Sequence, residues 1–170
     1  MKIRARMRDV RGAAAVEFAL VVPLVIVVLI GTITTAMVYG DYVALNNAAR
    51  EGARYGAAAD ITSSSWATDV RDRVKQVYFN SNGTQPTDAD ICVRLVTAAG
   101  ATLASYTGSS CGTAPAAPTT MNAGSCAVLV WMEEPDSIST GLMPAMHPTL
   151  HAQSVAYYQQ AVTGTSCIAS

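Results

Sequence analysis

The sequence has few charged residues, and they are unevenly distributed. Only 14% of its 170 residues are Asp, Glu, Lys or Arg, and none lies in the 22 residues from Phe18 to Tyr39. Hydrophobic residues make up 51% of the chain and the mean hydropathy is +0.27, values that exclude a disordered chain and an ordinary soluble domain. As a helix, the uncharged run would span ~33 Å, enough to cross a hydrocarbon core of ~30 Å. The sequence therefore predicts a membrane span.

Basic residues are scarce beyond the N-terminus. Five of the eleven precede residue 12, whereas from Asp41 onward six basic residues face ten acidic ones. That balance leaves no basic patch for nucleic acid. A basic flank before the span, with none directly after it, predicts a cytoplasmic N-terminus and an extracytoplasmic head. We therefore expect a single-pass protein of the cytoplasmic (inner) membrane, in contact with its lipid bilayer.

A cleaved secretory signal peptide is the alternative interpretation of this N-terminus. Such a signal would have a shorter apolar core, no acidic residue and a small-x-small cleavage site after it. Thr34-Thr35-Ala36 matches such a site poorly, and Glu17 lies inside the apolar region. A retained anchor is the favoured prediction.

Motifs for catalysis are also lacking. The sequence contains no C-x-x-C, no H-E-x-x-H, no glycine-rich phosphate loop and no nucleophile elbow, which argues against zinc, thioredoxin-like and hydrolase chemistry. His147 and His151 are four residues apart, a spacing that binds zinc on a helix. Acidic residues that could lie nearby are Glu133, Glu134 and Asp136. Because this region is typical of a strand, we expect solvated or core histidines, and hence no enzymatic activity, no metal and no cofactor.

The head contains all four cysteines: Cys92, Cys111, Cys126 and Cys167. An even number in an exported domain predicts two disulfide bonds. Three connectivities are possible, and the favoured one joins Cys92 to Cys111 and Cys126 to Cys167. Four buried reduced thiols are the alternative.

The pattern of apolar residues in the head predicts an α+β fold. Trp66, Val70, Val74 and Val77 form one stripe of an amphipathic helix, and the serines at 63–65 offer N-caps. Alternating or continuous apolar runs predict strands at 91–96, 101–106, 126–132 and 147–162, the first two as a hairpin. Residues 107–125 have the composition of a loop. We expect a basic leader (1–12), a transmembrane and continuing helix (13–58) and a head (59–170) with one further helix and a small antiparallel sheet.

Glu17 is the one carboxylate in the apolar N-terminal region, and its position has a pattern around it. A basic leader is followed by Gly12, four small or apolar residues, Glu17, Phe18 and a long apolar helix. This arrangement resembles the cleavage region of type IV prepilins, and most of all the short form of tight-adherence (Flp-type) pilus systems. The resemblance implies that an inner-membrane prepilin peptidase cuts after Gly12 and leaves Ala13 as the new N-terminus.

Cleavage would give Glu17 a use. The new ammonium group at Ala13 lies one helical turn from Glu17, so Glu17 of one subunit could pair with the amine of the next when helices bundle. A charge that costs roughly 2.5–3.5 kcal/mol in hydrocarbon would then serve assembly. The alternative is that Glu17 only extends to the cytoplasmic headgroups.

The segment after the span contains small residues at helical spacing. We call Ala44, Ala48, Ala49, Gly52, Ala53, Gly56 and Ala57 the small-residue face. Such a face allows close approach of another helix or sheet, either in an assembly or within the same chain. The run Ala-Ala-Arg-Glu-Gly-Ala-Arg at 48–54 is similar to the TadE-like family, in which the anchor helix ends in this pattern.

The two resemblances imply one function. We expect a pilin-like subunit (minor pseudopilin) of the tight-adherence pilus and secretion machinery, which assembles through its N-terminal helix with Flp pilin or other pilin-like subunits. The alternative is a membrane-tethered extracytoplasmic domain that binds or hydrolyses a ligand.

Overall fold

The computed structural model describes residues 3–80, 83–135, 148–159 and 167, with side chains from residue 12 onward. Its elements are α1 (Ile3–Ala58), α2 (Trp66–Val77), a 3-10 turn η1 (Asp88–Asp90) and the strands β1 (Ile91–Thr97), β2 (Thr102–Thr107), β3 (Cys126–Pro135) and β4 (Thr149–Tyr157). A long helix, a second helix and one antiparallel sheet confirm the α+β prediction.

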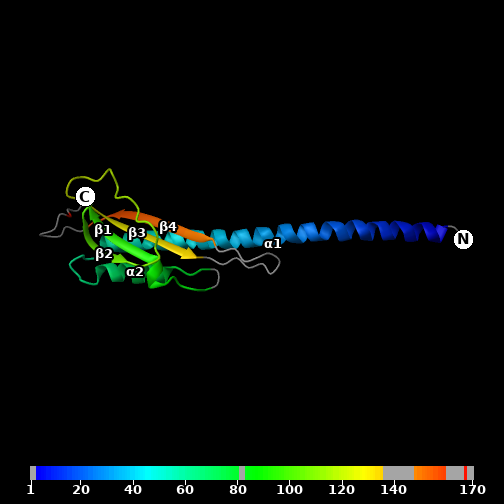
Figure 1. Ribbon diagram of the computed structural model, residues 1–170, viewed down its shortest axis with the longest axis horizontal. Coiled ribbons are helices and arrows are strands. Elements are labelled where there is room, and N and C mark those ends of the chain that lie inside the picture. The colour runs from blue at the N-terminus through cyan, green and yellow to red at the C-terminus, as the bar shows by residue number, and fades with distance from the viewer. Residues whose placement is uncertain (1–2, 81–82, 136–147, 160–166, 168–170) are drawn as a thin grey trace.

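Helix α1 dominates the shape of the molecule. It has 56 residues, and Figure 1 shows its N-terminal half projecting alone while its C-terminal half lies along the sheet. Helix α2 lies beside that C-terminal half and contacts it directly. The head is therefore built on the C-terminal half of α1, whereas the apolar run lies in its N-terminal half.

The four strands form one sheet with the order β2-β1-β3-β4. All neighbours are antiparallel. Gly100, with a φ of +80°, makes the turn of the expected β1–β2 hairpin, a conformation that glycine adopts without steric cost. Strand β4 pairs with β3 at the other edge of the sheet.

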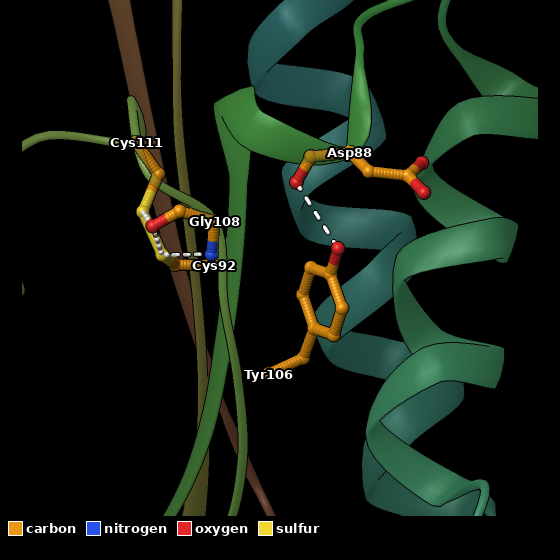
Figure 2. Close-up of a disulfide and its surroundings, with 5 residues drawn as sticks. All are labelled: Asp88, Cys92, Tyr106, Gly108 and Cys111. Carbon is orange, nitrogen blue, oxygen red and sulfur yellow. Dashed lines mark hydrogen bonds between the residues drawn. A yellow bond between two sulfur atoms is a disulfide. The ribbon is translucent and has the colours of Figure 1, made fainter.

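The two faces of the sheet are covered differently. Ile91, Val93 and Leu95 of β1 point into the main core beneath the helices. Cys92 and Val96 point the other way, into a smaller cluster with Trp131 of β3. Figure 2 shows this division, with Tyr106 directed toward the helices and the Cys92–Cys111 disulfide on the opposite side of the strands.

One local expectation for α2 is wrong. Val77, predicted as part of the core stripe, is 38% exposed, whereas Tyr78 is fully buried. The reason is that α2 ends at Val77 and Tyr78 takes an extended conformation, which turns its ring inward. Ser65 is the N-cap residue but makes no capping hydrogen bond; its hydroxyl donates to Asp69 Oδ2 instead, at 2.8 Å.

Candidate anchor and assembly surface

The N-terminal half of α1 is a candidate membrane span. Among the residues that the structure describes, no other helix is long and apolar enough to cross a membrane. The rest of the molecule buries none of its most apolar stretch. Large side chains such as Phe18, Leu20 and Leu24 are each about 70% exposed. An exposed apolar surface of this length needs an apolar environment, and a bilayer provides one.

Polar groups inside this span are satisfied by the helix itself. The hydroxyls of Thr32, Thr34 and Thr35 donate to backbone carbonyls three or four residues earlier, at 2.8–2.9 Å. This matters because an unsatisfied polar group in hydrocarbon costs several kcal/mol. The threonines therefore add little cost to insertion.

The residues of the prepilin-like pattern all lie on α1. Gly12, Ala13, Glu17 and Phe18 are exposed in an unbroken helical segment. Ala13 and Glu17 are separated by about one turn, ~6 Å along the axis. Glu17 has no ion-pair partner among the residues whose side chains the structure describes, from residue 12 onward.

The small-residue face, in contrast, is occupied by the head. Ala48, Ala49 and Ala53 are fully buried in the main core. A Cβ added at Gly56 would lie 2.9 Å from Val70 Cγ2 of α2 and 3.0 Å from Val128 Cγ1 of β3. A Cβ at Gly52 would overlap Val74 Cγ2. Of the two interpretations, packing within the chain is therefore the one seen, and the glycines are required by close approach.

On its polar side, the same segment of α1 forms an ion pair with α2 of the head. Glu51 accepts hydrogen bonds from Arg54, at 2.8 and 2.9 Å, and from Arg73 of α2, at 2.9 Å. These bonds, with Arg54 the stronger influence, lower the pKa of Glu51 to about 2. Trp66 adds a further link, because its Nε1 donates to the Gly56 carbonyl at 3.0 Å.

Residues 12–54 match the family model of TadE-like proteins. This confirms the resemblance to the TadE-like family seen in the sequence. The TadE-like match begins at Gly12, includes the whole candidate span, and ends at Arg54, inside the part of α1 that the head covers. Comparison with curated proteins and with solved structures gives no match.

The TadE-like segment thus supplies only one side of the main core. Its buried glycine, Gly52, lies against Val74 and Val130, both beyond residue 54.

Two disulfide bonds fasten the head, with the pairing favoured from the sequence. Cys92 is joined to Cys111, and Cys126 to Cys167. The first holds the loop after β2 on the outer face of the sheet. The second attaches Cys167 to the start of β3, which keeps Cys167 within the main core.

The histidine pair considered for catalysis is only partly described. His147 lies outside the described residues. His151 lies on β4, and its Nδ1 is 2.8 Å from Glu133 Oε1 on β3. Its side chain is 64% exposed. The residues that the structure describes contain no group of three His, Cys, Asp or Glu side chains able to hold a metal ion.

Two buried acids that no sequence pattern predicted lie where the head meets the span. Asp41, the first charged residue after the span, is buried, and so is Glu134 of β3. Burial raises the pKa of Glu134, opposed by hydrogen bonds from Tyr78 and Asn80; the Asn80 amide donates to Glu134 Oε1 at 3.1 Å. The only sequence signal was the position of Asp41 directly after an uncharged run.

Proposed function

We propose that the protein is a pilin-like subunit, a minor pseudopilin, of the tight-adherence pilus and secretion machinery. The observation that carries this proposal is the TadE-like match over residues 12–54, which contains Gly12, Glu17 and the exposed apolar half of α1. The N-terminus lies in the cytoplasm, as the basic leader favours, and the head lies outside. The protein has no catalytic function of its own.

Three steps make up the proposed mechanism. A prepilin peptidase cuts after Gly12 and releases an amine at Ala13. The Glu17 carboxylate then pairs with that amine on a neighbouring pilin-like or Flp pilin subunit, while the exposed apolar surfaces of the helices pack together. The disulfide-linked head remains outside and moves with its helix because it is packed around it.

The structure adds one condition to the cleavage step. The Gly12–Ala13 bond lies within a continuous helix, and a peptidase that binds an extended substrate must first open that turn. Glycine weakens a helix by ~1 kcal/mol relative to alanine, so opening costs less at Gly12 than at its alanine neighbours. A glycine immediately before the cleaved bond thus suits the reaction physically.

Mass spectrometry of the N-terminus tests the proposal. In a host with its own prepilin peptidase, the mature chain should begin at Ala13, and Gly12→Leu should leave it uncut. Gly40→Leu, in the same helix, is the matched control and should be cut normally. An intact Met1 in a strain that forms pili would leave an ordinary signal anchor and favour the membrane-tethered binding domain.

A further inference from the structure

At one end of the head, several aromatic and apolar side chains are exposed while two nearby carboxylates are buried. We call this end the base of the head: the exposed side chains of Tyr39, Tyr42, Val43 and Phe79, with exposed fractions of 66%, 44%, 39% and 54%. The nearby carboxylates of Asp41 and Glu134 are only 4% and 7% exposed. Exposed apolar patches and buried charges are the informative departures from an ordinary protein surface.

The packing of the two helices places Phe79 at this end. Val70 lies against Gly56 and Val74 against Gly52, so α2 runs antiparallel to α1 and returns toward the span. The segment after α2 continues in that direction, because Asn80 bonds to Glu134. Asp41 also acts electrostatically on Glu134. Phe79 follows the buried Tyr78 and precedes Asn80. It therefore lies near the point where the span ends and the head half of α1 begins.

The length of the span fixes the depth of this surface. From Phe18 to Gly40 the helix rises ~34 Å, which slightly exceeds a hydrocarbon core of ~30 Å, and the headgroup layers bring a bilayer to ~40–45 Å. Tyr39, Tyr42 and Val43 thus fall at the boundary or within the headgroup layer. No loop separates the span from the head, since α1 is unbroken through Gly40. The head cannot move away from the membrane surface.

We propose that the base of the head is a lipid-contact surface that rests in the headgroup layer of the bilayer. Tyrosine and phenylalanine combine apolar rings with tolerance of the wet interface, where aromatic residues concentrate in membrane proteins. The burial of Asp41 and Glu134 keeps their charges away from this layer. The occupant is lipid because the surface is continuous with the span. The proposal rests on the membrane-spanning role of α1 in the proposed function.

A consequence of this contact is a fixed orientation of the head. Side chains on two sides of the base, Tyr42 on α1 and Phe79 after α2, would both touch the layer, and two such contacts oppose tilting. A subunit held upright presents the rest of its head in one direction, which favours ordered assembly over random encounters.

An environment-sensitive fluorophore tests this surface in the full-length protein. Phe79→Cys is labelled with an NBD group in liposomes of phosphatidylethanolamine and phosphatidylglycerol; the four native cysteines are in disulfides and leave the new thiol free. Tyr55→Cys is the matched control, because Tyr55 is also an exposed aromatic, 40% exposed, and lies ~24 Å beyond Tyr39 on the same helix. Lipids with a nitroxide at the headgroup should quench position 79 several-fold more than position 55.

Three results decide the matter. Equal quenching at positions 79 and 55 overturns the lipid-contact proposal. Protection of position 79 that requires added pilin subunits also overturns it, and assigns the surface to a protein. A third probe, Leu24→Cys, reports on the span itself: if it is accessible to water, the membrane-spanning role fails, whereas a protected Leu24 with an accessible Phe79 rejects the contact surface alone.

Discussion

The two halves of α1 carry surfaces of opposite kind on one continuous helix. In the anchor half, large apolar side chains such as Val25, Ile26 and Leu29 are about half exposed. In the head half, small residues such as Ala49 and Gly52 are buried beneath the sheet and α2. Side-chain size separates the two functions: large groups cover area against lipid or a neighbouring helix, and small groups let the head approach the backbone.

The comparison also concerns the two glutamates of this helix. Glu17 in the anchor half has no partner among the described residues, whereas Glu51 in the head half is bound by two arginines. Glu51 thus has its partners within the chain, whereas we propose that Glu17 finds its partner on a second subunit. Substitutions that affect one half and spare the other test this difference.

The largest effect is expected for Glu17→Gln. If Glu17 pairs with the Ala13 amine of a neighbour, the substitution leaves a buried ammonium without its partner, at a cost of about 3–5 kcal/mol or a several-hundred-fold weaker docking. The processed protein should stay in the membrane but no longer co-purify with pilin subunits. Glu51→Gln is the control, and should leave docking unchanged. Normal co-purification of processed Glu17→Gln protein would show that the carboxylate is not the docking group.

Removing a disulfide should weaken only the head half. The double substitution Cys126→Ser/Cys167→Ser is expected to lower the free energy of unfolding of the head by about 2–5 kcal/mol. Cys92→Ser/Cys111→Ser should cost about 0.6 kcal/mol less, because its loop has a sequence separation of 19 rather than 41 and closure entropy grows slowly with length. Denaturant unfolding and limited proteolysis measure both. Four alkylatable thiols in freshly exported protein would contradict the disulfide assignment.

Gly52→Ala should destabilise the head by about 1–3 kcal/mol, since its methyl group must displace Val74 in a packed core. The gain in helix propensity offsets part of this cost. Gly40→Ala is the matched control, because a Cβ there meets nothing within 4 Å; it should be neutral or stabilise by up to ~1 kcal/mol. Thermal unfolding in detergent compares the two. Equal changes in stability for Gly52→Ala and Gly40→Ala would mean that Gly52 is no more closely packed than Gly40.

The smallest effects should come from pH, with opposite signs for two carboxylates. The arginines that lower the pKa of Glu51 to about 2 stabilise the head above the unfolded value of 4.5, and this contribution is lost as pH falls toward 2. Burial raises the pKa of Glu134, so its contribution is present below 4.5 and is lost as pH rises through its folded value.

Two substitutions separate these contributions. In Glu134→Gln, the free energy of unfolding should fall less as pH rises above 4.5. In Glu51→Gln, it should fall less as pH drops below 4.5. Thermal unfolding of the head from acidic to neutral pH measures both. An unchanged pH profile in Glu134→Gln would show that burial of its charge has no energetic consequence.

Local patterns in the sequence were sufficient for most elements. The apolar run at 91–96 identified β1, and the stripe of Trp66, Val70 and Val74 identified α2. These predictions succeeded because burial of one face repeats with the period of the element. The exposed span followed in the same way from an uncharged run long enough for a bilayer.

Patterns were insufficient where the outcome depended on where an element stops. Val77 continued the stripe of α2, yet Tyr78 fills that end of the core because the helix ends between them. Periodicity assumes that the helix continues. Ser65 occupies the N-cap position, as expected, but its side chain makes no capping hydrogen bond and its hydroxyl donates to Asp69 Oδ2.

The sequence by itself determined that α1 has an apolar half, a single glutamate within that half, and a small-residue face. These are properties of residues close together in the chain. Only the tertiary structure decided what the small-residue face contacts. Gly52 and Gly56 are suited to any close partner, and the partner proved to be Val74, Val70 and Val128 of the same chain. It also decided that Asp41 is buried beside Glu134 while Phe79 faces outward. Such pairings join residues far apart in sequence, and they are set by the packing of the whole head, which no local pattern encodes.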